Sequence, residues 1–138
     1  MNNQKLPELV LGIIKKDNQT LIIQRAKEER GTDNIKLSWA FPGGKVETGE
    51  TKDIAVVREL LEETGYQAEV VGIISERQHP QFPVYVYYIE CNLKSDTPIQ
   101  QIQDEEIKEV KWVSTPELMN YFTTNLDPKV ADYLGVTI

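Results

Sequence analysis

Some residue types and patterns are scarce in this chain of 138 residues, and each scarcity excludes something. Cys91 is the single cysteine, so no internal disulfide can form. Its apolar neighbours predict a small buried side chain, and a free thiol of this kind fits a reducing, cytoplasmic location. The apolar run near the N-terminus is too short for a membrane span and lacks the flanks of a signal peptide. We therefore expect a cytoplasmic protein without a membrane partner.

Positive charge is also scarce. Lys and Arg number 15 against 22 Asp and Glu, which gives a net charge of -7. Proteins that bind duplex nucleic acid electrostatically need clustered Lys and Arg against the phosphates, so this composition excludes such a partner. An anionic small molecule could still bind, but it would need local basic residues or a bound cation.

The residues that are present are those of an ordinary globular protein, with 40% hydrophobic and 27% charged residues. The length predicts a single domain over residues 1–138. Strands are predicted by alternating or β-branched apolar runs, the first region being a hairpin that turns at residues 17–19. The predicted strand regions are 8–26, 34–41, 67–75, 82–93 and 105–113. With a central helix after residue 51 and short helices near 116–122 and 128–135, the pattern predicts an α/β protein with a mixed sheet.

The central helix is marked at both ends. Thr51 is a good N-cap, and Gly65 stands where a left-handed residue ends a helix. At about 100° per residue, four apolar residues share one face, which we expect to pack on the sheet. They are Ile54, Val57, Leu60 and Leu61.

Three carboxylates, Glu59, Glu62 and Glu63, fall on the opposite face of this helix, where we expect them to be exposed. Glutamates on a helix usually form only its solvated face. Here, however, Glu59 and Glu63 are one turn apart and repel each other, and Arg58 is the only local compensation. A hard divalent cation such as Mg²⁺ or Mn²⁺ would convert this repulsion into binding.

The segment from Gly44 to Tyr66 resembles a known family motif. Gly44, five residues, Glu50, seven residues and then RELLEETGY resemble the Nudix box, G-x5-E-x7-R-E-U-x-E-E-x-G-U, where U is a bulky apolar residue. All seven fixed positions match, and Tyr66 replaces the usual aliphatic residue. The order of predicted strands is also similar to that of the Nudix α/β/α sandwich, a mixed sheet with a central catalytic helix.

The resemblance implies an activity and roles for the box residues. Nudix enzymes use Mg²⁺ or Mn²⁺ to hydrolyse a nucleoside diphosphate linked to a group X. It implies that Glu59, Glu62 and Glu63 bind metal, with the carbonyl of Gly44 completing the coordination. Glu59, Glu62 and Arg58 would then be catalytic, and Arg58 would pair with Glu50 or with a metal-binding glutamate.

The same resemblance implies an additional acid, base or metal ligand outside the box. The acidic stretch at residues 103–113 supplies the candidates. Glu106 aligns best as a catalytic residue and Glu105 is second, while a merely solvated loop remains the alternative. The general base is thus left open between Glu62, Glu105 and Glu106.

Four residues are candidates for contacting the nucleotide. ERQHP, at residues 76–80, resembles a stretch of MutT-like members and would place Arg77 and His79 near the substrate. Trp39 could stack on a base, and Arg25, which ends an apolar run, could bind a phosphate. For each of the four, a structural or surface role is the alternative.

The resemblance implies three possible functions. The first is hydrolysis of a (d)NTP or an oxidised purine nucleoside triphosphate, a small-molecule substrate, by a monomer or homodimer. The second is hydrolysis of ADP-ribose or a nucleotide sugar. The third is a noncatalytic nucleotide-sensing module, which the intact set of box glutamates disfavours.

Overall fold

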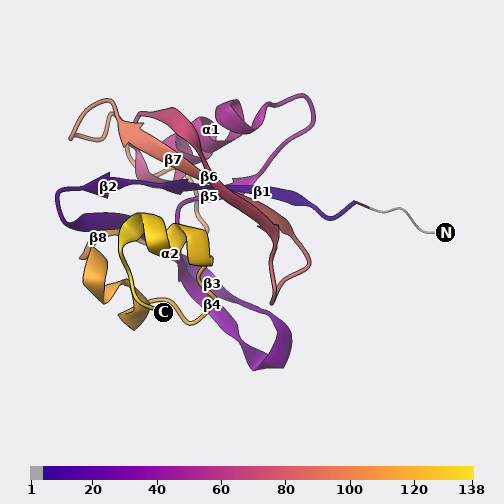
Figure 1. The fold of residues 1–138 in the computed structure, drawn as a ribbon. Coiled ribbons are helices and arrows are strands. Elements are labelled where there is room, and N and C mark those ends of the chain that lie inside the picture. The colour runs from indigo at the N-terminus through magenta and orange to yellow at the C-terminus, as the bar shows by residue number, and fades with distance from the viewer. Residues whose placement is uncertain (1–4) are drawn as a thin grey trace.

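The structure, a computed structural model, describes residues 5–138 and contains two four-stranded sheets (Figure 1). The first sheet is mixed, because β1 and β7 are parallel while the other neighbours are antiparallel. Its strand order is β5 (Gly43–Lys45), β1 (Glu8–Ile13), β7 (Tyr85–Leu93) and β6 (Ala68–Gln78). The mixed sheet predicted from the sequence is therefore present.

The second sheet is antiparallel throughout. Its strands are β2 (Lys15–Lys16), β3 (Gln19–Arg30), β4 (Lys36–Ala40) and β8 (Ile107–Ser114), with β8 and β4 both pairing with β3. The predicted hairpin is the β2–β3 pair, which turns at Asp17 with a φ of 55°. Most of the first apolar run, however, forms β1, which pairs with β7 and so belongs to the other sheet.

The helices cover both sides of the sheets. Helix α1 (Lys52–Thr64) begins with the Thr51 hydroxyl accepting a hydrogen bond from the Ile54 N–H and ends at Gly65 with a φ of 79°. The other helical elements are η1 (Thr32–Asn34), η2 (Thr115–Asn120) and α2 (Pro128–Leu134), so the helix predicted near residue 116 is a 3₁₀ helix. Within residues 5–138, no helix is long and apolar enough to cross a membrane.

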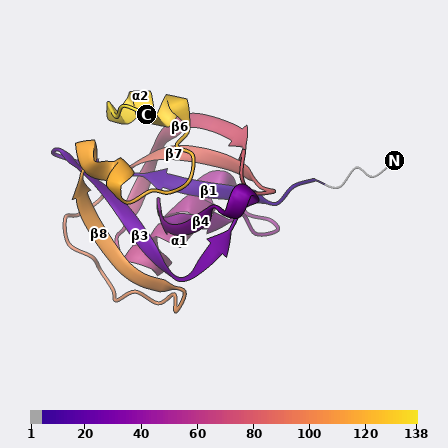
Figure 2. The same ribbon diagram turned by 90° about the horizontal axis from the view of Figure 1, so that it is seen from below.

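Two apolar clusters fill the space between the layers. One packs α1 against β1, β3 and β7 through side chains that include Val56, Leu60 and Ile89, and it contains the buried Cys91. The other packs η2 and α2 on the opposite side through Leu118, Phe122 and Val130. In Figure 2 the strands β1 and β7 run between α2 and α1. This arrangement confirms the α/β/α sandwich.

The buried face of α1 differs from the predicted one. Ile54 is 58% exposed, whereas Ala55, Val56 and Leu60 are fully buried. The buried face therefore follows the rows 55–59–63 and 56–60–64, and Glu63 is only 3% exposed. The expectation that Glu63 is surface-facing was wrong, because Glu63 stands seven residues after Val56 and so shares its face.

Candidate functional site

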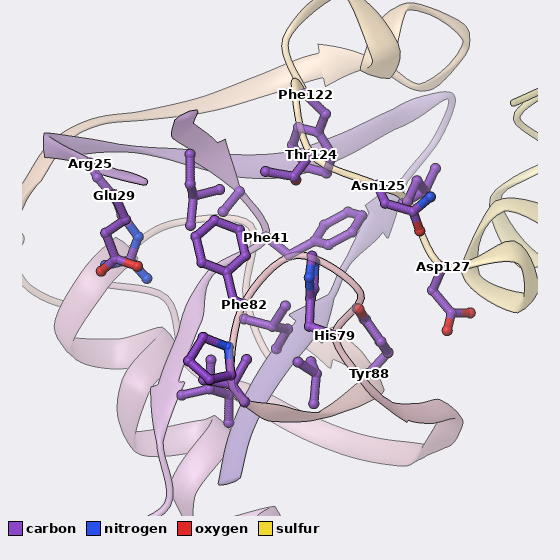
Figure 3. A pocket seen from close by; sticks show the side chains of 18 residues that line it. Arg25, Glu29, Phe41, His79, Phe82, Tyr88, Phe122, Thr124, Asn125 and Asp127 are labelled. Carbon is purple, nitrogen blue, oxygen red and sulfur yellow. The ribbon is translucent and has the colours of Figure 1, made fainter. Parts of the chain in front are cut away.

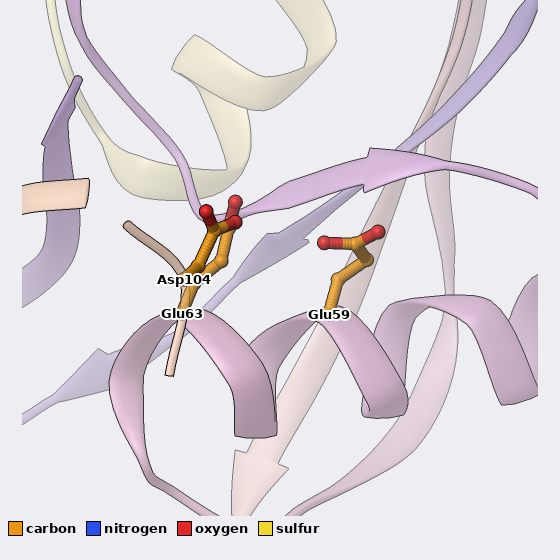
Figure 4. A group of neighbouring side chains, drawn as sticks. All are labelled: Glu59, Glu63 and Asp104. Carbon is orange, nitrogen blue, oxygen red and sulfur yellow. The ribbon is translucent and has the colours of Figure 1, made fainter. Parts of the chain in front are cut away.

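Three carboxylates meet where α1 faces the loop between β7 and β8. Glu59 and Glu63 project from successive turns of α1, and Asp104 comes from the loop (Figure 4). One oxygen from each of the three carboxylates lies within 4.8 Å of the other two. The cluster thus joins two segments that lie far apart in the sequence.

The short strand β5 closes one side of the cluster through two glycines. The N–H of Gly43 donates a hydrogen bond of 2.7 Å to Oε1 of Glu63. A Cβ at residue 44 would lie 2.6 Å from the carboxylate of Glu59, and one at residue 43 would lie 1.9 Å from the carbonyl oxygen of Val10. Only glycine lets this backbone approach the carboxylates so closely.

Backbone contacts with the end of α1 fix the position of Asp104. The N–H of Gln103 donates to the carbonyl oxygen of Glu62 at 3.0 Å, and the N–H of Ile99 donates to that of Gly65 at 2.8 Å. The loop therefore satisfies carbonyl groups that the helix end leaves unpaired. Asp104 follows directly after the first of these contacts and so enters the cluster.

The carboxylates are electrostatically costly in this arrangement. Burial raises the pKa of Glu63 to about 8, opposed in part by the hydrogen bond from Gly43. Burial also raises the pKa of Glu59, and the nearby Arg58 opposes this shift. Buried carboxylates at close range favour either a proton or a metal cation.

Arg58 holds the rim of the cluster together. Its guanidinium makes a bidentate pair with Glu50 at 2.6 and 2.8 Å, so the pairing expected from the sequence is present. The hydrogen bonds from Arg58 lower the pKa of Glu50 to about 2. Nη1 also donates to Glu59 at 3.0 Å and to Glu62 at 3.3 Å. One side chain thus orients two of the box glutamates.

The remaining acidic candidates lie outside the three-carboxylate cluster. The side chain of Glu62 is 41% exposed and lines an open hollow together with Asp104, Glu105 and Glu106. Glu105 and Glu106 are exposed, so the residue of this stretch that joins Glu59 and Glu63 is Asp104. The acidic composition could reveal the stretch, but only the loop contacts select the residue.

A cavity of about 210 Å³ adjoins this region, with walls that are mainly apolar (Figure 3). Phe41, Phe82 and Tyr88 supply aromatic side chains to its wall. Of the four predicted nucleotide contacts, Arg25 and His79 line the cavity. Phe82 and Tyr88 were not recognised from the sequence as wall residues, because strand alternation alone cannot distinguish a cavity from the core.

Trp39 and Arg77 are not among the cavity residues. Trp39 packs edge-on against Tyr121, with 5.3 Å between the ring centroids. Arg77 donates a hydrogen bond of 2.7 Å to Oδ1 of Asn125 and lies 3.5 Å from the buried Asp127. It therefore supports the loop that carries the cavity residue Asn125.

Arg25 connects the cavity with the carboxylates. Its side chain is 17% exposed, and its buried Nε has no hydrogen-bond partner among residues 5–138. Its positive charge lowers the pKa of Glu63, and its nearest ion-pair partner, Glu29, is 3.9 Å away. A buried guanidinium N–H without an acceptor is suited to an anionic ligand.

The donor set fits a hard divalent cation. Carboxylate and carbonyl oxygens are the ligands that Mg²⁺ and Mn²⁺ prefer, and the cluster offers carboxylates on one side and the backbone of Gly44 on the other. Burial is the main cause of the raised pKa of Glu63, so its charged form is disfavoured unless a cation lies beside it. Arg58 compensates mainly the negative charge of Glu50, which lies at the rim of the cluster.

Comparison with known proteins connects this geometry with a family. A sequence model of the NUDIX domain matches residues 7–134. The chain is 31% identical over 122 residues to a putative 8-oxo-dGTP diphosphatase of Bacillus subtilis, covering 88% of this chain and 75% of that protein. It is 36% identical over 103 residues to putative nudix hydrolase 1 of Caenorhabditis elegans, covering 74% of this chain but 26% of the worm protein.

Other matches agree with this result. An ADP-ribose pyrophosphatase of Methanocaldococcus jannaschii is 44% identical over 69 residues, which are 50% of this chain and 38% of that protein. The chain thus spans well under half the length of two of these three relatives. A solved NUDIX hydrolase from Nitrosomonas europaea superposes with a TM-score of 0.74 at 23% identity, covering 95% of this chain and 90% of the other. With the box, the fold and the match over residues 7–134 in agreement, the chain belongs to the Nudix hydrolase family.

Proposed function

We propose that this chain is a metal-dependent pyrophosphohydrolase that cleaves a nucleoside diphosphate linked to a group X. The observation that carries the proposal is the junction of the three-carboxylate cluster and the aromatic cavity at Arg25. A ligand with an anionic chain at one end and a flat apolar ring at the other is complementary to such a junction. A nucleoside triphosphate has this shape and charge.

Glu59, Glu63 and Asp104 would hold Mg²⁺ or Mn²⁺, with the carbonyl of Gly44 as a further oxygen ligand. When bound, the ion neutralises charge on the diphosphate and lowers the pKa of a water molecule. The protein contributes by fixing the carboxylates: Gly43 orients Glu63, and Arg58 orients Glu59 and Glu62.

Glu62 is the proposed general base. Its carboxylate is the most exposed of the three box glutamates and lines the hollow beside Asp104. It can therefore take the proton from a water molecule that attacks phosphorus, while Arg58 holds the carboxylate in place. Glu105 and Glu106, on the rim of the same hollow, are the alternatives for this role.

Arg25 and the cavity are proposed to bind the rest of the substrate. The unpartnered guanidinium N–H of Arg25 would bind a phosphate oxygen, and Phe41, Phe82 and Tyr88 would enclose the base. The name of the Bacillus subtilis relative, an 8-oxo-dGTP diphosphatase, favours a (d)NTP or an oxidised purine nucleoside triphosphate as substrate. The 44% identity to an ADP-ribose pyrophosphatase favours ADP-ribose as the second candidate.

A release assay tests the proposal. Phosphate and pyrophosphate release would be followed with Mg²⁺ or Mn²⁺ over (d)NTPs, 8-oxo-dGTP, ADP-ribose, sugar nucleotides and dinucleoside polyphosphates. Glu62→Gln serves as the matched variant, because its exposed side chain can be changed without disturbing the core. We expect metal-dependent turnover of nucleoside triphosphates that falls ~100-fold or more in Glu62→Gln. Turnover confined to ADP-ribose would favour the second candidate, and no turnover of any compound would contradict both.

A further inference from the structure

The only histidine of the chain, His79, lies in the wall of the aromatic cavity. In Figure 3 its imidazole stands among Phe41, Phe82 and Tyr88. The ring packs edge-on against Phe82, with 5.2 Å between the centroids. A polar group thus sits in a wall that is otherwise mainly apolar.

The tautomer of His79 is fixed by the backbone. The N–H of Gln81 donates a hydrogen bond of 3.0 Å to Nδ1 of His79, so Nδ1 must offer a lone pair. In a neutral imidazole the proton is then on Nε2. Burial and the charge of Arg77 lower the pKa of His79 to about 4, so the ring is neutral near pH 7.

Gln81 is itself held on two sides. Its carbonyl oxygen accepts a hydrogen bond of 3.0 Å from the N–H of Thr32, at the β3–β4 connection. Its Oε1 accepts a bond of 2.8 Å from the N–H of Asn125, in the loop before α2. The group that fixes the imidazole is therefore tied to the β3–β4 connection and to the loop that carries the cavity residue Asn125.

Two nearby polar groups, the Tyr88 hydroxyl and Oδ1 of Asn125, already have partners, but Nε2 of His79 has none within residues 5–138. The hydroxyl of Tyr88 accepts from Nε of Arg77 at 3.3 Å, and Oδ1 of Asn125 accepts from Nη1 of Arg77. Of the two imidazole nitrogens of His79, only Nδ1 takes part in a hydrogen bond with residues 5–138. The cavity wall thus contains an N–H donor, Nε2 of His79, that has no partner within residues 5–138.

We propose that Nε2–H of His79 is a specificity-determining donor that selects nucleobases with a carbonyl oxygen at this edge over bases with an amino group there. The inference rests on the proposed function, because it assumes that the cavity binds the base. A carbonyl oxygen would accept the hydrogen bond. An exocyclic amino group would set two donors against each other and leave both unpaired. For purines, this favours the 6-oxo over the 6-amino ring.

Binding of dIMP and dAMP tests the selection, because the two bases differ only at their 6-position edge. With ¹⁵N-labelled histidine, the single imidazole reports its own tautomer and its contact with each nucleotide. At pH 7 we expect the proton on Nε2, a shift of that resonance with dIMP, and about tenfold or more tighter binding of dIMP than of dAMP. His79→Phe keeps an aromatic ring but should bring the affinity ratio close to one. His79→Gln keeps an N–H donor and should retain part of the preference.

The outcomes separate this inference from the proposed function. A proton on Nδ1, equal affinities in the wild-type protein, or an unchanged ratio in His79→Phe would each overturn the role of His79. If triphosphates are still hydrolysed in such a case, the proposed function stands alone. If neither monophosphate binds and no triphosphate is hydrolysed, both fail.

Discussion

A carboxylate that is almost completely buried beside two others costs free energy on folding, and Glu63 is in this position. It is 3% exposed and has Glu59 and Asp104 as neighbours. The single N–H of Gly43 compensates only part of this cost, because the pKa of Glu63 still rises to about 8. At the residue scale, the charged form of Glu63 therefore needs a cation that the protein does not itself provide, and this agrees with the proposed metal site.

His79 gives a prediction about pH. Its folded-state pKa of about 4 lies below the unfolded value of 6.5, so the unfolded chain binds a proton more readily. The stability that comes from neutral His79 is fully present above pH 6.5 and is lost as the pH falls towards 4. Since the ring is only partly buried, we expect a loss of about 1–2 kcal/mol.

Urea unfolding at several pH values checks this expectation. Between pH 7 and pH 4.5 the wild-type protein should lose more unfolding free energy than His79→Gln, since other groups titrate alike in both. Parallel pH profiles of the two proteins, or an imidazole that titrates near pH 6.5 by NMR, would refute the assignment.

Single residues also show which parts of the site could be predicted from the sequence. The box spacing predicted that Glu59 and Glu63 act together, and the structure brings them into one cluster. The sequence could not show that Asp104 rather than Glu106 joins this cluster. That outcome depends on the hydrogen bond from the Gln103 N–H to the carbonyl oxygen of Glu62. The role of Trp39 as a base contact stays a prediction, because its ring packs on Tyr121 and does not line the cavity.

At the scale of elements, the end of α1 and the loop that carries Asp104 form one unit. Gly65 has a φ of 79°, and a Cβ there would lie 2.2 Å from the carbonyl oxygen of Gln100. Gly135 ends α2 with a φ of 73°, but a Cβ at that position meets no atom within 4 Å. The two glycines therefore differ in crowding at nearly the same backbone conformation.

Gly65→Ala should thus cost more than Gly135→Ala. Both substitutions force alanine into a left-handed conformation, at about 1–2 kcal/mol. Gly65→Ala should cost at least ~1 kcal/mol more, because the loop must move. It should also reduce metal-dependent turnover, since Asp104 moves with the loop. Denaturant unfolding and turnover of both variants check this. Equal losses of unfolding free energy in the two variants would contradict the claim that the end of α1 and the loop form one unit.

The buried face of α1 can be tested by a second pair of variants. Val56 is fully buried and Ile54 is 58% exposed. Val56→Ala should lower the unfolding free energy by about 2 kcal/mol, whereas Ile54→Gln should change it by no more than about 0.5 kcal/mol. Chemical denaturation measures both. A larger loss for Ile54→Gln would favour the face predicted from the sequence over the observed one.

The helix shows why the sequence predicted elements better than faces. Thr51 and Gly65 marked both ends of α1 correctly, because capping is a local property. The choice of face depends on what lies opposite. Here β5 presents Gly43 and Gly44 to the glutamates, so a polar side of the helix is buried. Hydrophobic periodicity alone misses such a face.

At the scale of the whole molecule, a chain with a net charge of -7 concentrates negative charge at one site beside an apolar cavity. Helices on both sides of the sheets complete the scaffold, and most strands were predictable from their apolar runs. Their division into two sheets was not, because β1 pairs with β7, which is more than seventy residues away. The strand β1 also pairs with β5, whose glycine backbone lies next to α1.

The most direct test of the central claim is the affinity for Mn²⁺, measured from the free ion by electron paramagnetic resonance. Wild-type protein, Asp104→Asn and Glu117→Gln would be compared, since Glu117 is an exposed carboxylate in η2 outside the cluster. If Glu59, Glu63 and Asp104 form the metal centre, Asp104→Asn should weaken binding by about tenfold or more, and Glu117→Gln should leave it unchanged. Equal Mn²⁺ affinity in all three proteins would contradict the account.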